Sequence, residues 1–234
     1  MTRILAIETS TELATAALLT DERILIRELN GVQTHSQGIL PAIQSLLMEA
    51  GIRLRDCDAI AFGCGPGAFT GIRTACGIVQ GLAYGADLAV LPVVSLLAMA
   101  QAAREQSQAE QFVCILDARM NEVYWAQYRF DDAGWVEVSA PALNSLDQAL
   151  AGITLESAQL VLGNGLNLPE SAGTKFASMN CMPHAKQILS LATLDFAAGR
   201  SVPADQAQPL YLRNKIALTT AEREQVKAQT AERV

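Results

Sequence analysis

The sequence predicts an α/β protein with two lobes, each built on a mixed sheet flanked by helices. Three observations lead to this prediction: an antiparallel meander opens the chain, strands and helices then alternate, and a second strand-rich set begins near residue 111. The 234 residues, with 50% hydrophobic and 18% charged content, provide enough apolar material for one large or two small cores.

The first lobe begins with three strand-like runs at residues 3–7, 13–19 and 23–29, separated by short polar turns. A helix follows, because Ser36 is a candidate N-cap and the apolar residues after it recur at helical spacing until Gly51. The remaining elements of this lobe are expected to be a strand at 59–63, a helix at 70–85, a strand at 88–94 and a helix at 95–105.

The second lobe begins with an apolar strand at residues 111–116, followed by an alternating strand that carries Tyr124, Ala126, Tyr128 and Phe130. The boundary between the lobes is placed near residues 107–110. The expected domains are residues 1–107, joined by a returning C-terminal helical segment at 184–213, and residues 108–183. Residues 214–234 are polar and are expected to form a mobile tail, with a transient helix at 220–233 as the alternative.

A glycine-rich stretch at residues 63–73, GCGPGAFTGIR, interrupts the chain between an expected strand and an expected helix. Glycine allows positive φ and close backbone approach, so such turns often present N–H groups to phosphate at a helix N-terminus. The stretch lacks the Gly-Lys-Ser/Thr ending of a Walker loop, and it lacks the dinucleotide-binding pattern with its later acidic residue. A phosphate loop and a purely structural turn both remain open.

Five separate blocks of the chain resemble the bacterial TsaB family in its own order. Residues 66–73, PGAFTGIR, are similar to the Pro-Gly-Ser-Phe-Thr-Gly-Leu-Arg signature of that family. The other blocks are ILAIETST at 4–11, HSQ at 35–37 before LPAI, GLAY at 81–84 and DARMNEVY at 117–124. The resemblance covers residues 3 to about 213. It implies the actin-like, Hsp70-like (ASKHA) fold without catalytic activity, and a role in making threonylcarbamoyladenosine beside the tRNA anticodon.

The resemblance also implies partners. The expected ones are the catalytic paralogue TsaD, the ATPase TsaE and, when TsaD is absent, a second copy of this chain. A net charge of −7 and a pI near 4.9 argue against a chain that grips nucleic acid alone, so tRNA is expected only through the complex. The alternative is an independent actin-like small-molecule kinase or ATPase.

No catalytic, cofactor-binding or metal-ligating residue is predicted. Family resemblance places the two metal-binding histidines of TsaD near Ser95 and Met99 here, and neither side chain can replace imidazole. Glu8 ends the first strand, where it could position magnesium as in actin-like ATPases or serve as a hydrogen-bonded structural carboxylate. His35 is expected to bond at a helix entry and His184 to start a helix. The isolated chain is therefore expected to carry no cofactor.

Other candidate sites have an ordinary structural interpretation as well as a functional one. Asp117, Arg119, Glu122 and Tyr124 form either a salt-bridged hairpin or, through Arg119 and Glu122, part of the lining of a cleft between lobes. The Gly-Asn-Gly sequence at 163–165 is either a hairpin turn or an adenosine contact. The five scattered cysteines predict buried thiols in a reducing compartment, and neither a signal peptide nor a membrane span is expected, which favours the cytoplasm.

The helix expected at residues 70–85 is apolar nearly all round, so it must be covered on two sides. Gly77, Gly81 and Gly85 recur every fourth residue and form a flat strip that another backbone could approach. If the preceding helix lies beside it, two chains could meet as a four-helix contact. We predict that Val79→Glu or Leu82→Arg, whichever residue faces solvent, abolishes self-association and TsaD binding. The predicted interface comprises Leu40, Ile43, Leu47, Arg73, Cys76, Gly77, Val79, Gln80, Gly81 and Leu82.

Overall fold

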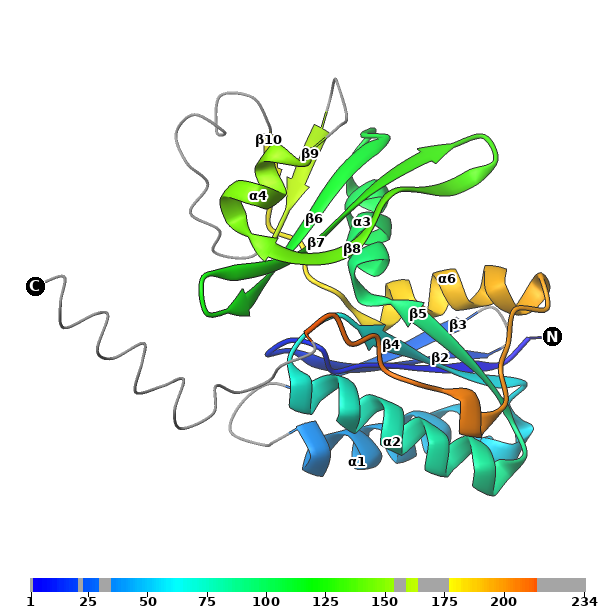
Figure 1. Cartoon of the computed structure of the whole chain (residues 1–234). Helices are drawn as coiled ribbons and strands as arrows, with labels where there is room; N and C mark the ends of the chain where they lie inside the picture. Colours follow the sequence, from blue (N-terminus) through cyan, green and yellow to red (C-terminus); the bar gives the residue numbers. More distant parts are fainter. Residues whose placement is uncertain (1, 21–22, 30–34, 154–158, 164–176, 214–234) are drawn as a thin grey trace, which may run out of the picture.

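The computed structural model describes residues 2–20, 23–29, 35–153, 159–163 and 177–213, which form two five-stranded sheets in two lobes (Figure 1). Each sheet mixes parallel and antiparallel pairs and is flanked by helices. The predicted two-lobed α/β architecture is confirmed.

The first sheet contains the first five strands, which are β1 (Ile4–Glu8), β2 (Ala14–Thr20), β3 (Arg23–Leu29), β4 (Ala59–Gly65) and β5 (Ala89–Val94). Their order is β3-β2-β1-β4-β5: β1, β2 and β3 form the predicted antiparallel meander, whereas β1, β4 and β5 run parallel. Alternation along β1 sends Leu5 and Ile7 to one face and Ile4 and Ala6 to the other. Both faces of this sheet are therefore buried.

Helices cover both faces of the first sheet. One face carries α1 (His35–Ala50) and α2 (Phe69–Ala86), whereas α3 (Ser95–Gln106) and α6 (Ala185–Ala197) lie on the other (Figure 1). Gly51, with φ of 67°, follows α1 at the predicted end. All four helices lie where the sequence places them, because each has a long apolar stripe.

The second sheet repeats the plan of the first. Its strands are β6 (Gln111–Arg119), β7 (Glu122–Asp131), β8 (Gly134–Ser145), β9 (Gln159–Leu162) and β10 (Ala177–Met179). The order is β10-β9-β6-β7-β8, again with an antiparallel meander on one side of a central strand and parallel strands on the other. The sequence predicts β6 and β7 but not the three later strands or α4 (Leu146–Ala151).

The core of the second lobe is shared with α3. Leu96 and Met99 of this helix pack with Phe112 and Cys114 of β6, while α4 covers the opposite face of the sheet. The helix α3 thus links the cores of both lobes. The limits 1–107 with 184–213, and 108–183, stay predictions, and the predicted tail at 214–234 lies outside the described residues.

The C-terminal segment returns to the first lobe through α6 and then runs along α2. Val202 bridges to Val90 of β5, the short helix η2 (Ala204–Gln206) follows, and Leu210 N donates to Cys64 O at 2.7 Å. In Figure 1 this segment runs alongside α2, above it in the view, and ends beside the second lobe. We call residues 207–213 the C-terminal strap.

Candidate functional site

The glycine-rich turn joins β4 to α2 at the edge of the first sheet where β1 also ends, because β1 and β4 are parallel. Gly65 has a φ of 107°, a conformation that favours glycine, and α2 begins four residues later at Phe69. The turn and the residues that follow β1 are therefore side by side.

The turn packs directly on the chain that follows β1. Ala68 N donates to Ser10 O at 2.7 Å, and Thr9 Oγ1 donates to Gly71 O at 2.7 Å. A Cβ on Gly67 would lie 2.5 Å from Ser10 O, and a Cβ on Gly71 would overlap Thr9 O. These glycines make room for the protein's own backbone, which favours the structural turn over the phosphate loop.

Glu8 is fully buried at the end of β1. Its Oε1 accepts from Ser10 N at 2.5 Å, and its Oε2 accepts from Ser95 Oγ at 2.8 Å. Gly63 has no room for a Cβ because the Glu8 carboxylate fills that space. Burial raises the pKa of Glu8, although the hydrogen bonds oppose the rise. This geometry favours the hydrogen-bonded structural carboxylate over a magnesium-positioning group.

The helix α3 carries Ser95 and Met99 on its buried side, and both are fully inaccessible. Met99 packs in the second-lobe core, and the Ser95 hydroxyl is bonded to Glu8, so both side chains are enclosed by the protein's own atoms. His184 caps α6, its Nδ1 accepting from Lys186 N at 3.0 Å, as predicted. Within the described residues no group of three or more His, Cys, Asp and Glu side chains is placed to hold a metal ion.

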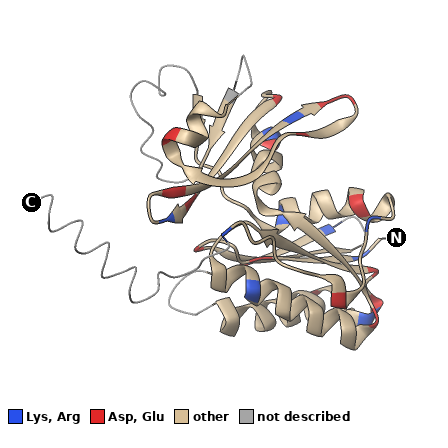
Figure 2. Ribbon diagram, in the orientation of Figure 1, with Lys and Arg blue, Asp and Glu red and all other residues tan. Residues whose placement is uncertain are grey.

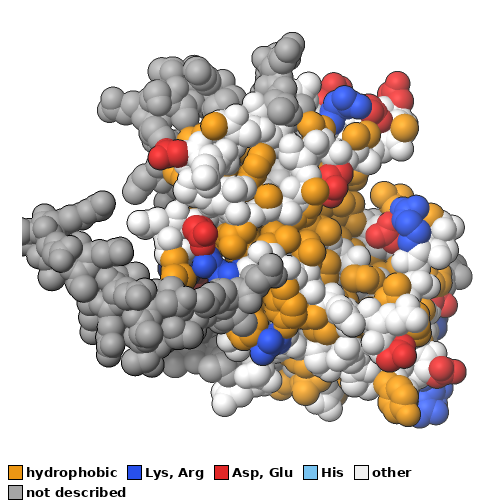
Figure 3. Space-filling model, in the orientation of Figure 1, with side chains coloured by type: hydrophobic (Ala, Val, Ile, Leu, Met, Phe, Trp, Pro, Cys, Tyr) orange, Lys and Arg blue, Asp and Glu red, His pale blue; other side chains and the backbone are white. Residues whose placement is uncertain are grey.

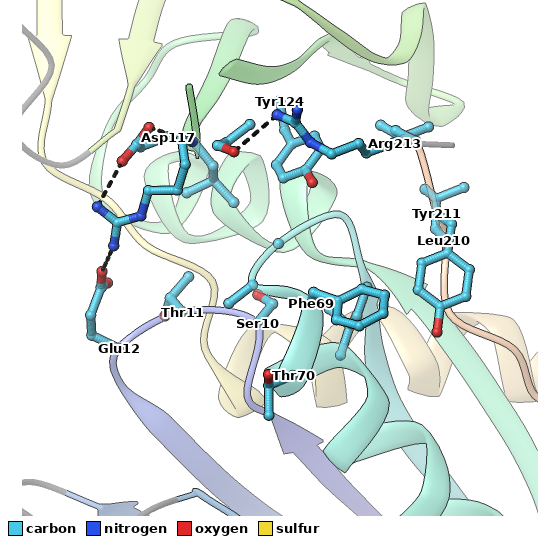
Figure 4. A pocket seen from close by; sticks show the side chains of 18 of the residues that line it. Ser10, Thr11, Glu12, Phe69, Thr70, Asp117, Tyr124, Leu210, Tyr211 and Arg213 are labelled. Carbon is cyan, nitrogen blue, oxygen red and sulfur yellow. Dashed lines mark hydrogen bonds and ion pairs between the residues drawn. The ribbon is translucent and has the colours of Figure 1, made fainter. Parts of the chain in front are cut away.

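A cleft with a volume of about 810 Å³ lies between the lobes, above the glycine-rich turn (Figure 4). Most of its lining comes from the turn after β1, the first turns of α2, the β6–β7 hairpin and the end of the C-terminal strap, and the start of α1 and Met182 complete it. Phe69, Tyr124 and Tyr211 give it aromatic surface, whereas Ser10, Glu12 and Arg119 give it polar groups.

The predicted polar cluster is both a salt-bridged hairpin and part of this cleft. Arg119 lies 3.2 Å from Asp117 and 3.8 Å from Glu12 across the cleft (Figure 4). Asp117, Arg119 and Tyr124 line the cleft, as the second interpretation requires. Glu122 is not among the lining residues and instead pairs with Arg213 at 2.5 Å, so its predicted place in the cleft was wrong.

Two further predictions concern the rim of the cleft and a distant turn. His35 begins α1 and its Nε2 lies 3.1 Å from Glu12 O, which confirms the helix-entry contact. Gly163 follows β9, but Asn164 and Gly165 lie outside the described residues, so the choice between hairpin turn and adenosine contact stays open.

The C-terminal strap covers part of α2 that the sequence assigns to a partner. Gln80 Nε2 donates to Ala207 O at 2.7 Å, and the Cys76 thiol contacts the same oxygen at 3.3 Å. Arg73 Nε donates to Tyr211 Oη at 2.7 Å. The second cover that α2 requires is therefore supplied, along this side, by the chain itself.

The ten predicted interface residues divide by burial. Ile43, Cys76 and Val79 are buried in the core of the first lobe; Leu47, Gln80 and Leu82 are half-buried; and Leu40, Arg73, Gly77 and Gly81 are exposed. The placement of these three side chains on the surface was wrong: Ile43 is on the side of α1 that packs in the core, and Cys76 and Val79 are on the corresponding side of α2. Because α2 is apolar on more than one side, its sequence does not reveal which side meets the sheet. Val79→Glu would consequently disrupt the core.

One face of α2 is open. A Cβ added to Gly77, Gly81 or Gly85 would meet nothing within 4 Å, and Tyr84 beside them is 86% exposed. We call these four residues the open α2 face. Figure 2 shows no charge along α2 between its first turns and its end. In Figure 3 the hydrophobic side chains gather mainly where the two lobes meet. On α1, Leu40 and Met48 are also exposed.

Sequence reasoning missed Tyr84, Met48 and the strap. Tyr84 stands in the GLAY block, so a large aromatic residue beside a strip of glycines was a usable signal. The strap sequence AQPLYLR has neither helical nor strand periodicity, and nothing in it indicates the contact with α2.

Two lobes with one strand plan and a cleft between them define a two-lobed protein of the actin-like class. The family model described as TsaD, tRNA N6-adenosine threonylcarbamoyltransferase, matches residues 23–227. The tRNA threonylcarbamoyladenosine biosynthesis protein TsaB of Haemophilus influenzae is 40% identical over 228 residues, which cover 91% of this chain and 94% of that protein. The protein of the same name from Escherichia coli K12 is 37% identical, covering 92% and 96%. The chain belongs to the TsaB family.

Solved structures agree with this assignment. The protein YeaZ of Pseudomonas aeruginosa superposes with a TM-score of 0.81 at 37% identity, over 91% of this chain and all of that one. A second structure from Pseudomonas aeruginosa, titled as similar to the peptidase YeaZ, gives a TM-score of 0.84 at 38% identity with the same coverage. No helix among the described residues is long and apolar enough to span a membrane.

Proposed function

We propose that this chain is a non-catalytic partner subunit in the formation of threonylcarbamoyladenosine beside the tRNA anticodon, and that it binds and supports a TsaD-like catalytic paralogue. The observation that carries the proposal is the burial of Ser95 and Met99. These are the positions at which family resemblance places the metal-binding histidines of TsaD. Here a hydroxyl bonded to Glu8 and a thioether packed in a core occupy them, so the chain supplies no imidazole ligand.

The open α2 face supports the choice of partner surface. Glycines that meet nothing in their own chain let another backbone approach closely, and Tyr84 offers a large apolar anchor next to them. The neighbouring α1 adds Leu40 and Met48. An uncharged surface of this kind fits a helical partner with small and apolar residues, either the paralogue or a second copy of this chain.

The remaining parts of the proposal follow from charge and family. A net charge of −7 leaves the chain without a basic footprint, so we assign tRNA binding to the complex and not to this subunit. We further propose that a TsaE-like ATPase joins the assembly, that the chain works in the cytoplasm and that it has no metal or nucleotide cofactor of its own. The homodimer forms when the paralogue is absent.

The structure around the end of β1 and the glycine-rich turn argues against the competing function, an independent actin-like kinase or ATPase. A kinase of this fold needs a carboxylate and glycine backbone facing a bound nucleotide at the first strand turn. Here Glu8 is sealed by two hydrogen bonds, and Gly67 and Gly71 are occupied by contacts with Thr9 and Ser10.

Co-purification with the TsaD-like paralogue from the same organism tests the proposal. The wild-type chain should form a stable complex, and complete modification of tRNA should require both chains together with the other pathway enzymes. The isolated chain should not turn over threonylcarbamoyl-adenylate or hydrolyse ATP. Turnover by the chain alone would refute the non-catalytic role.

Surface variants separate binding from folding. Tyr84→Arg on the open α2 face should remove both complex formation and self-association while circular dichroism stays native. Leu194→Arg is the matched control, because Leu194 is 60% exposed on α6, on the opposite side of the sheet, and should bind as wild type. Wild-type binding by both variants would show that the interface does not include the open α2 face.

A further inference from the structure

The exposed side of α2 carries a symmetric series of residues. Arg73, Gly77, Tyr84 and the C-cap residue Asp87 are all exposed, and their spacing places them along one side of the helix. Residue 80 is the midpoint between Arg73 and Asp87, and the midpoint between Gly77 and Tyr84 lies between residues 80 and 81. A cation and a carboxylate thus form the outer pair of the series, a glycine and a tyrosine form the inner pair, and both pairs share one centre.

The cation at the start of the series is held in place but has no carboxylate partner. Arg73 Cζ lies 3.7 Å from the ring centroid of Phe69 and 5.5 Å from that of Tyr211, and Arg73 Nε donates to Tyr211 Oη at 2.7 Å. Within the described residues its Nη atoms make no hydrogen bond or ion pair. Because the chain itself already orders this side chain, an incoming carboxylate would have little rotamer entropy left to overcome.

The carboxylate at the other end of the series lies where the helix does not favour it. Asp87 has a φ of 55° and caps the C-terminus of α2. The C-terminus of a helix carries partial negative charge, so a carboxylate there is unfavourable. No ion pair among the described residues offsets this charge. A cation brought from outside the chain would do so.

A second copy of the chain in the antiparallel orientation matches every member of the series. A two-fold axis at residue 80 would place Arg73 of each copy against Asp87 of the other, in two ion pairs about 21 Å apart at 1.5 Å per residue. Tyr84 of each copy would cover Gly77 of the other, and the stretch between the charges is uncharged (Figure 2). A parallel pairing would instead bring Arg73 against Arg73 and Asp87 against Asp87, so the charges select the antiparallel orientation.

We propose that two copies of this chain associate through antiparallel α2 helices about a two-fold axis near Gln80, with Arg73 of each copy paired to Asp87 of the other. This inference rests on the homodimer proposed above and adds its orientation and its register. Arg73 and Asp87 set the orientation, while Gly77 and Tyr84 supply the close contact between the helices.

Charge reversal of the full chain, followed by sedimentation equilibrium, tests the pairing. Arg73→Glu and Asp87→Lys should each raise the dissociation constant of the dimer about tenfold or more, because each variant brings two pairs of like charges together. The double variant Arg73→Glu/Asp87→Lys should recover most of the lost affinity, because both ion pairs form again with exchanged signs. Asp132→Lys makes the same change of charge in the turn between β7 and β8 and should associate as wild type.

Disulfide cross-linking tests the orientation without charge reversal. Arg73→Cys and Asp87→Cys chains should cross-link when they are mixed, and neither should cross-link to itself. The native thiols that would compete are buried. Cross-links within each single variant would indicate the parallel orientation and overturn the proposal.

Two further outcomes separate this inference from the proposed function. A wild-type dimer that is insensitive to charge reversal, or a double variant that associates no better than either single variant, would overturn the pairing and leave the homodimer intact. A wild-type chain that stays monomeric at every concentration would refute the homodimer and the pairing together.

Discussion

The chain uses glycine in two regions for opposite purposes. At the glycine-rich turn, a Cβ on Gly63, Gly67 or Gly71 would strike the protein's own atoms, whereas on the open α2 face a Cβ on Gly77 or Gly81 would meet empty space. The first set is required by the fold, because β1, β4 and α2 could not otherwise meet. The second set costs helix stability and gives the isolated chain nothing in return. Glycines that the fold does not need are a sign of contact with something outside the chain.

The largest effect on the free energy of unfolding is expected in the glycine-rich turn, where Gly71 packs against the backbone of Thr9. Gly71→Ala places a methyl group against Thr9 O, which is backbone and cannot move aside without breaking the Thr9–Gly71 hydrogen bond. We expect a loss of about 3 kcal/mol in the free energy of unfolding, measured by urea denaturation. A loss below about 0.5 kcal/mol would mean that the turn can open and that the fold does not require glycine at this position.

The pH dependence of stability tests the carboxylate beneath this turn. Burial raises the pKa of Glu8 above its usual 4.5, so the folded chain holds the proton more tightly than the unfolded chain does. The contribution of this group to stability is fully present below that value and is lost as pH rises through the raised pKa. Glu8→Gln keeps an acceptor for Ser10 N and removes the titration. Melting curves from acid to neutral pH should show this loss in wild type and not in the variant.

Sequence reasoning predicts well the elements whose periodicity is strong. The β1 to α3 run, the hairpin of β6 and β7 and α6 are found where predicted, because each buries a continuous apolar stripe or face. The later strands β8, β9 and β10 were missed. Of these, β8 is half-buried almost throughout and contains Pro141, so neither alternation nor an apolar run marks it, and β10 has only three residues.

The candidate site was less accessible to sequence reasoning. The resemblance located the turn and α2, but only the fold shows that Val79 faces the sheet while Gly81 faces outward. The cleft depends on the approach of Arg119 to Glu12, more than a hundred residues apart in sequence, which no local pattern encodes.

A smaller effect is expected where the chain itself covers α2. Tyr211 is a partly exposed residue of the C-terminal strap. Its ring centre lies 5.8 Å from that of Phe69, and its hydroxyl accepts a hydrogen bond from Arg73 Nε. Tyr211→Ala should cost about 1 kcal/mol, because a partly exposed cation–π contact and one hydrogen bond are lost. Hydrogen exchange should then quicken at Leu210 N, which bonds to Cys64 O. Unchanged exchange would show that the strap is held without this tyrosine.

The smallest effect on stability is expected on the open α2 face, where it most directly tests whether the exposed glycines meet a partner. Gly81→Ala adds a methyl group in open space within a helix, so the isolated chain should gain about 0.5–1 kcal/mol. The same methyl group would stand between α2 and any backbone that approaches the open α2 face, so binding to the TsaD-like paralogue and self-association should both weaken.

A variant that is more stable alone but binds its partner more weakly separates the effect of Gly81 on helix stability from its effect on binding. A core substitution changes both together and cannot separate them. Gly199→Ala is an unsuitable control because Gly199 has a φ of 69°, whereas Ala198→Gly at the end of α6 changes helix stability away from this face. Undiminished binding by Gly81→Ala would mean that the strip does not meet a partner backbone, and the glycines of α2 would then have no explanation in this surface.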